Sequence, residues 1–204
     1  MTSWAALYGE HCSLRHKTGE RSVLELRNVL RRLAELPGSV LDSRAHQRLQ
    51  ASRNRATGFE VVQFSQDGSE DLHLYEHPEF ERAIHLIEAK LTVQLRIHRP
   101  TDRLHQLTVM VEGTRRAGGP WVVAVHLPDD RPNDMSSQPD RQGHGACGHA
   151  ALHAHVGPTM NDEPKVRVPL PTVSAGQILE WVLSQVVPTV DFEAAPWAAI
   201  APVS

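Results

Sequence analysis

The chain has 204 residues, a formal net charge of −3 and two cysteines. This length fits a single domain with a sizeable core, and we expect one domain over residues 1–204. The slight acidity predicts no general attraction to nucleic acid or to anionic membranes. Cys12 and Cys147 are too few for a disulfide framework. No segment reaches the length of a transmembrane helix and the first residues lack a secretory signal pattern, so we expect a cytoplasmic protein.

The first 57 residues are predicted to be mainly helical. Thr18 can cap a helix that runs to about Leu36 and ends at Pro37-Gly38. This helix carries one apolar stripe, formed by Val23, Leu26, Leu30 and Leu33. A weaker helix is expected from Asp42 to Arg53.

Residues 58–204 are predicted to form a sheet with a C-terminal helix. Two short strands at 59–65 and 71–75 flank Asp67-Gly68, a pair typical of a hairpin turn. Pro78 is expected to start a helix that reaches about Lys90. Three strands follow: Leu91–His98, Leu104–Glu112 and Trp121–Leu127. The last is apolar over Trp-Val-Val-Ala-Val, which indicates a central position in the sheet.

The C-terminal part adds another strand and a helix. Pro169 marks the segment from Val166 to Leu170 as an edge strand. Ser174 and Gln177 form a capping box that opens a helix, which Pro188 ends. We therefore predict an α+β protein, with a mostly antiparallel sheet of about six to seven strands packed against three to four helices.

The segment from Gly143 to Pro158 carries four of the thirteen histidines and one cysteine. Gly148 and Gly157 bracket a stretch of strand length rather than helix length, so a strand is predicted. Alternation then places His149, Ala151, His153 and His155 on one face. We expect these imidazoles to face solvent and the apolar residues between them to face the core.

Two of these histidines have the spacing of metal ligands. His153 and His155 would lie roughly 6.5 Å apart on one strand face, close enough to share a zinc ion, whereas His149 would be roughly 13 Å from His153. His126 or His98 on neighbouring strands could supply a third ligand, but the spacing does not require it. We therefore expect imidazoles that are too dispersed for one reactive centre, and a zinc ion on His153 and His155 remains the alternative.

A long polar loop precedes the histidine-rich segment. Residues 128–142 contain three prolines and four aspartates, and such loops beside a sheet often serve in recognition. The candidate binding residues lie in this loop, in the histidine-rich segment and on the predicted edge strand: Asp129, Asp130, Asp134, His149, His153, His155 and Arg167.

The C-terminal third also resembles a known family. The sequence Val-Arg-Val-Pro-Leu-Pro at 166–171, the helix with Leu-Glu-Trp-Val-Leu at 179–183, and Val-Val-Pro at 186–188 followed by Trp197 are similar to the tail of the immunity proteins of bacterial deaminase toxins. The similarity spans about residues 143–197. It implies an α+β, non-enzymatic protein that works by binding its cognate toxin.

Three functions stay open at this point. The first is a non-catalytic protein that holds a protein or peptide partner. It could act as an immunity protein or as a peptide-binding accessory of a bacterial biosynthetic cluster. This function needs no catalytic residue and no cofactor, and it is compatible with a homodimer. The second is a metal-dependent enzyme using the histidine-rich segment 144–155, with zinc on His153 and His155 and with His149 or Cys147 contributing if the strand is irregular. The third is a sensor with a small-molecule pocket between sheet and helices.

Overall fold

A computed structural model describes residues 18–36, 39–65, 67–74, 86–127, 152–158, 167–169 and 174–185. Over these residues the chain forms an eight-stranded antiparallel sheet and three α-helices. The predicted α+β class with a mostly antiparallel sheet is therefore confirmed. None of the helices in the described ranges combines the length and the apolar character needed to cross a membrane.

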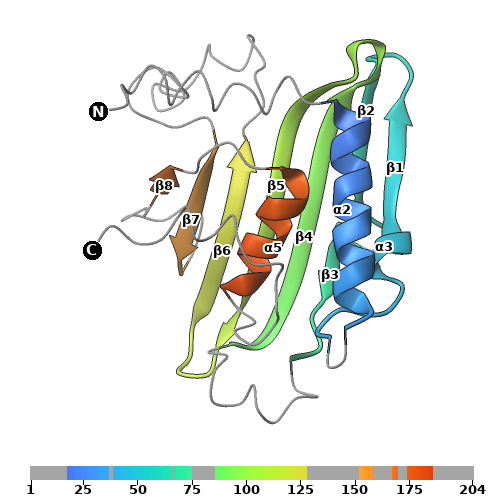
Figure 1. The fold of residues 1–204 in the computed structure, drawn as a ribbon. Coiled ribbons are helices and arrows are strands. Elements are labelled where there is room, and N and C mark those ends of the chain that lie inside the picture. Colours follow the sequence, from blue (N-terminus) through green and yellow to red (C-terminus); the bar gives the residue numbers. More distant parts are fainter. Residues whose placement is uncertain are drawn as a thin grey trace, which may run out of the picture.

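The strands follow one another across the sheet almost in chain order. Seven of them are paired in the order β1-β2-β4-β5-β6-β7-β8, and the short β3 pairs with β4 (Figure 1). Their bounds are β1 Leu49–Asn54, β2 Phe59–Phe64, β3 Ser69–Asp71, β4 Leu86–His98, β5 Arg103–Arg115, β6 Pro120–Leu127, β7 His153–Gly157 and β8 Arg167–Pro169. The 3-10 turn Arg99–Thr101 joins β4 to β5. The apolar β6 lies inside the sheet between β5 and β7, as predicted.

Helices α2 (Gly19–Ala34) and α5 (Ala175–Ser184) lie across one face of the sheet (Figure 1). Their starts are set by local chemistry. The Thr18 side chain accepts a hydrogen bond from the Arg21 amide, and Ser174 forms the predicted capping box with Gln177. The predicted stripe of α2 is buried, together with the apolar face of α5.

The hydrophobic core fills the space between these helices and the sheet. Alternate residues of β4, β5 and β6 point into it, for example Leu95, Val109 and Val125, each with no exposed surface. Arg32 of α2 forms an ion pair with the buried Glu180 of α5, across the pair of helices. The residues in between the core-facing ones form the opposite face of the sheet, which we call the outer face.

The second N-terminal helix is much shorter than predicted. Only α3 (Ala45–Arg48) is helical, and residues 49–54 form the edge strand β1. The helical portion predicted for residues 1–57 therefore ends at Arg48 within the described residues. The apolar spacing of Leu41, Ala45 and Leu49 fits a helix, but pairing of Leu49–Asn54 with β2 satisfies the backbone groups of this stretch instead.

The hairpin predicted around Asp67-Gly68 is also wrong. Asp67 and Gly68 do have the positive φ angles of a turn, 49° and 74°. However, β2 and β3 both pair antiparallel with β4, through Gln63–Gln94 and Ser69–Thr92. Two strands with the same orientation beside one partner continue each other, so the turn interrupts a strand instead of reversing the chain.

A third correction concerns the helix predicted from Pro78 to Lys90. Residues 86–90 are the first part of β4, and they pair with the end of β5. Residues 75–85 lie outside the described ranges. Tertiary pairing overrides the helical apolar spacing here, because β5 presents thirteen residues of edge to which β4 can extend.

Candidate metal centre

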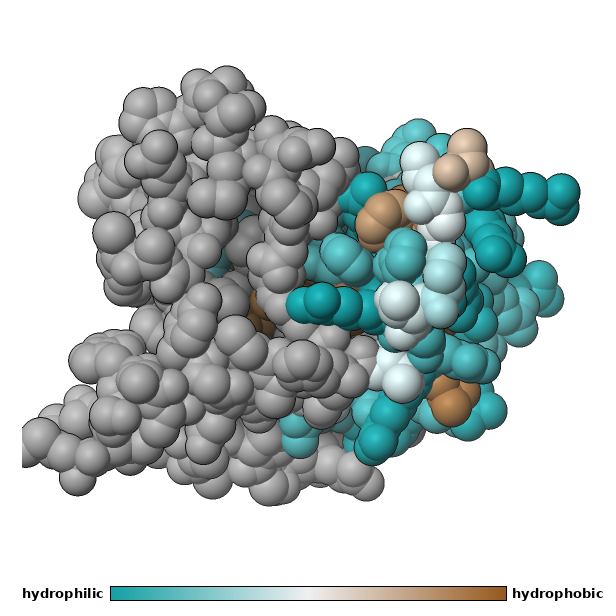
Figure 2. Space-filling model, turned by 90° about the horizontal axis from the view of Figure 1, so that it is seen from above, coloured by the Kyte–Doolittle hydropathy of each residue, from teal (hydrophilic) through white to brown (hydrophobic). Residues whose placement is uncertain are grey.

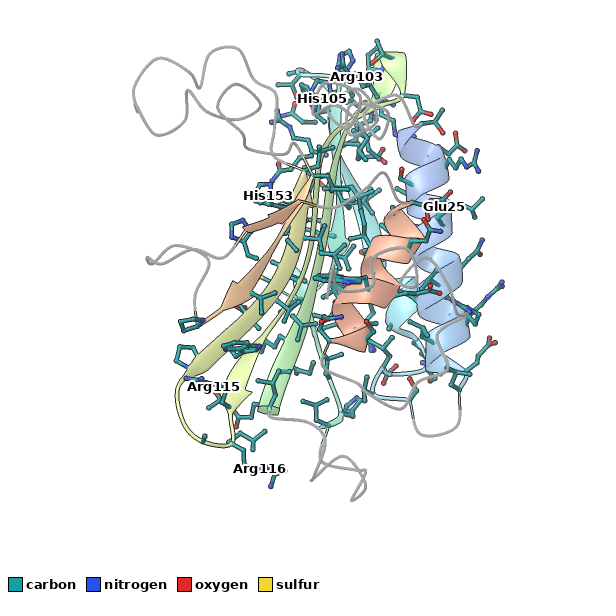
Figure 3. All side chains as sticks on the ribbon, turned by 60° about the vertical axis from the view of Figure 1, so that its left-hand side comes forward. Glu25, Arg103, His105, Arg115, Arg116 and His153 are labelled. Atoms are coloured by element: carbon teal, nitrogen blue, oxygen red, sulfur yellow. The ribbon has the colours of Figure 1, made fainter. Side chains whose placement is uncertain are left out.

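Three histidines meet on the outer face of the sheet, at adjacent positions of β6 and β7. His126 and His153 are direct partners in the antiparallel register, and His155 is paired with Ala124. All three alternate with core residues such as Val125 and Ala154, so they share the face turned away from α2 and α5. Figure 3 shows His153 on that side of the sheet.

The imidazole nitrogens of this three-histidine cluster converge. Nε2 of His126 lies 2.8 Å from Nε2 of His153 and 3.0 Å from Nε2 of His155. One ring nitrogen from each of the three residues can be chosen so that all lie within 4.8 Å of one another. His155 is opposite Ala124, whose side chain is a single methyl group.

Hydrogen bonding alone does not account for this arrangement. A ring nitrogen carries either one hydrogen or one in-plane lone pair, so it can form one good hydrogen bond. Nε2 of His126 faces two other ring nitrogens at hydrogen-bond distance. At most one of these contacts is therefore satisfied in full. A metal ion resolves the conflict, because it accepts the lone pairs of all three nitrogens at once.

The separations fit a small transition-metal ion. With zinc–nitrogen bonds of 2.0–2.1 Å and tetrahedral angles, ligand nitrogens lie about 3.4 Å apart. The two short contacts at 2.8 and 3.0 Å and the upper limit of 4.8 Å bracket that value. Three imidazoles are a donor set suited to zinc, copper, iron or nickel.

The prediction that these imidazoles face solvent is wrong for β7. His153 is 4% exposed and His155 is 6% exposed. β7 is an inner strand, paired with β6 on one side and β8 on the other, and the rings pack against one another with centroids 4.8 Å apart. Buried imidazoles need polar partners, because their nitrogens lose water as a partner. The expectation that the imidazoles do not gather at one centre is also wrong, because His126 joins His153 and His155.

Most of the other predicted site residues lie outside the described ranges of the chain: Asp129, Asp130, Asp134 and His149, and with them Cys147. Arg167 is in β8 and its backbone is paired with His155, while its side chain lies outside the description. His98, named above as a possible third ligand, instead contacts the Phe59 ring and Thr101 at the end of β4.

His126 is the site residue that sequence reasoning did not single out. It was one of two open choices for a third ligand, and nothing in its spacing from His153 fixes their pairing. A signal was present in the strand itself, since His126 interrupts the otherwise apolar run Trp121–Leu127. A polar residue in an inner strand calls for a buried partner.

Comparison with known proteins adds no relative to this picture. No family model, no curated protein and no solved structure matches the chain. The resemblance of the C-terminal third to immunity proteins therefore stays a prediction, and the functional argument depends on the cluster itself.

Proposed function

We propose that this protein binds a divalent transition-metal ion, zinc first among them, through Nε2 of His126, His153 and His155, and that it is a metal-dependent enzyme. The convergence of these three nitrogens on one point carries the proposal. It reverses the preference for a non-catalytic binding protein that the sequence alone favours.

The donor set indicates the kind of chemistry. Three neutral imidazoles leave the ion its full positive charge, whereas thiolate or carboxylate ligands would reduce it. Such an ion polarises carbonyl or phosphoryl oxygens and lowers the pKa of a bound water to about 7. Hydrolysis or hydration is therefore the reaction type that this site supports best. Cys147 and His149, from the segment before β7, are the candidates for a further ligand from the chain itself.

The first test is the metal content of protein purified without a polyhistidine tag. We expect about one zinc or other transition-metal ion per chain by elemental analysis, and none in a variant with His126, His153 and His155 all replaced by alanine. A matched control replaces His98 and His105, which lie on β4 and β5, and should keep the metal. Wild-type protein that neither contains metal nor binds added zinc, cobalt or nickel would contradict the proposal.

Metal binding should also depend steeply on pH. Each imidazole must be unprotonated to act as a ligand, so protons compete with the metal below the ordinary imidazole pKa of about 6.5. Affinity is therefore present in full at pH 7.5 and is lost as the pH falls. Between pH 7.5 and 5.5 we expect zinc affinity to fall by about two to three orders of magnitude, since three ligands are protonated. Zinc titration at several pH values checks this, and a flat profile would exclude imidazole ligation.

Partner binding is the second candidate, and one observation favours it. β1 is the first strand in the sheet order, and its residues 50–54 are exposed. Its outer edge can accept a strand from a peptide or protein partner. Within the described ranges, the strand at the opposite edge, β8, has three residues and offers less backbone for such pairing. A chain without metal but with a partner protein after purification from its host would favour this candidate.

A further inference from the structure

We propose a ligand site on the side of the sheet that faces the helices: a hollow at the C-terminal end of α5 that binds a carboxylic acid with a short apolar chain. The hollow has a volume of about 420 Å³, which is the size of a small-molecule site. It lies between the end of α5 and the hairpin that joins β5 to β6, at the lower end of the sheet in Figure 1. Its described lining consists of four apolar side chains, one amide and one cation: Ala117, Trp121, Val123, Val156, Gln185 and Arg115.

The apolar part of this lining belongs to the face of the sheet that carries the core. Val123 and Val156 are partners in the register of β6 and β7, and Trp121 lies two residues before Val123 on the same face. Trp121 and Val156 are only half-buried, although both pack against the core. By contrast, the described surface at the upper end of the sheet is mostly hydrophilic (Figure 2). The hollow therefore offers aliphatic and indole surface to an apolar ligand group.

A hydrogen-bond donor in the hollow lacks a partner. The Nε atom of Arg115 is buried, and no acceptor in the described part of the chain reaches it. Arg115 also forms no ion pair with a described residue. Buried polar groups in folded proteins are nearly always paired, because burial removes water as a partner. The unpaired Nε–H therefore indicates an acceptor that a ligand supplies.

Arg115 is held in place by its backbone and by an aromatic ring. Its N–H donates to the carbonyl of Gly119, and its carbonyl accepts from the N–H of Gly118, each over 2.9 Å. Its guanidinium carbon lies 5.4 Å from the centre of the Trp121 ring, within the range of a cation–π interaction. The Nε–H and the adjacent Nη–H of a guanidinium form an edge that can donate to both oxygens of a carboxylate. The position of this edge is thus set before the ligand binds.

The single cation indicates the class of ligand. Arg115 is the one charged side chain in the described lining. One positive charge balances a carboxylate, whereas a phosphate dianion would keep an unpaired charge among apolar groups, which is unfavourable. The C-terminal end of α5, at Gln185, carries partial negative charge and disfavours an anion close to it. The carboxylate is therefore assigned to Arg115 and the apolar chain to Trp121 and Val156.

This acid site is separate from the three-histidine cluster. His155 and Val156 are neighbours on β7, but alternation places them on opposite faces of the sheet. Figure 3 shows Arg115 near the lower end of the sheet and His153 well above it. The bound acid is therefore not the substrate of the proposed enzyme. The site instead fits the third function that the sequence leaves open, a sensor with a pocket between sheet and helices.

The first experiment uses chelator-treated full-length protein, so that its outcome does not depend on the metal centre. The protein is titrated with octanoate at pH 7.5, and binding is followed by amide chemical shifts. We expect saturable shifts at Ala117, Val123 and Val156. Affinity should rise about two- to fourfold per added CH₂ from butanoate to octanoate, because each CH₂ buries apolar surface. Octylamine should bind about tenfold more weakly than octanoate, since its ammonium group cannot accept from Arg115.

Substitutions of Arg115 test the recognition of the carboxylate. Arg115→Gln should weaken octanoate binding about tenfold or more. Arg115→Lys should have a smaller effect, because lysine keeps the charge but loses the two-point contact. Arg116→Gln is the matched control: it removes the same charge from the next residue, which is exposed, and should keep the affinity within about twofold.

Three outcomes would overturn the site. They are the absence of saturable shifts with octanoate, shifts confined to amides away from the hollow, and equal octanoate affinity in the wild type and Arg115→Gln. The backbone hydrogen bonds of Arg115 do not depend on its side chain, so Arg115→Gln should fold normally, which circular dichroism checks. The comparison of octanoate with octylamine uses the wild-type protein and decides the question even if that variant does not fold.

Discussion

Replacing His126 by alanine is expected to weaken zinc binding by about 100- to 1000-fold. His126 is the residue that both other imidazoles contact, at 2.8 and 3.0 Å. Its loss leaves His153 and His155 as a two-ligand site, and two imidazoles on neighbouring positions of a strand hold zinc weakly. Competition with a chromophoric chelator at pH 7.5 measures the affinity directly.

His105→Ala is the matched control for this substitution. His105 lies on β5 and on the same sheet face, and its ring contacts Phe59 at a centroid distance of 5.1 Å. Its removal should leave zinc affinity unchanged. Equal affinities for wild type and His126→Ala would show that the metal, if bound, is held elsewhere. Cobalt-substituted protein adds a second readout, because a thiolate-to-cobalt absorption band that disappears in Cys147→Ala would identify Cys147 as a further ligand.

Gly113→Ala should destabilise the fold by about 3 kcal/mol. Gly113 in β5 is paired with Ala89, next to a register shift between Leu86 and Glu88. A β-carbon at Gly113 would overlap the carbonyl oxygen of Glu88 and lie 3.1 Å from the α-carbon of Ala89. Both obstacles are backbone atoms of the central pair of strands, so neither can move without shifting β4. Chemical denaturation followed by circular dichroism gives the free energy of unfolding.

The control for this prediction is Gly157→Ala. Gly157 ends β7, and a β-carbon there meets no atom within 4 Å. Its substitution should change the free energy of unfolding by no more than about 0.5 kcal/mol. If both variants unfold like the wild type, the close approach at Gly113 is relieved by a small backbone movement. If both are destabilised alike, loss of glycine at a strand position and not the contact with Glu88 is the cause.

Elements whose signals are local were predicted well from the sequence. Thr18 and Ser174 cap helices through their own side chains, and the apolar stripe of α2 repeats within one helix. The alternation in Leu91–His98 of β4 and in β5 likewise needs no knowledge of neighbours, because each of these segments shows its buried face by itself. These segments gave the α+β class correctly.

The errors concern segments whose state depends on pairing. Leu49–Asn54 has a spacing that suits either a helix or a strand, and its pairing with β2 decides for the strand. Asp67-Gly68 has the residues of a hairpin turn, but the free edge of β4 accepts β3 as a continuation of β2. In both cases the local sequence allows two structures, and long-range hydrogen bonds select one of them.

The candidate site could likewise be predicted only in part from the sequence, because one of its residues depends on strand pairing. The spacing of His153 and His155 follows from the chain alone, since residues two apart on a strand share a face. His126 precedes His153 by 27 residues and still stands directly opposite it. This placement depends on the antiparallel register between β6 and β7. Register is set by the burial of entire strand faces, to which many residues contribute, and no motif of a few residues encodes it. The sequence by itself determined the α+β class, the helix caps and a pair of imidazoles on one strand face; the tertiary structure alone decided that a third imidazole completes the cluster.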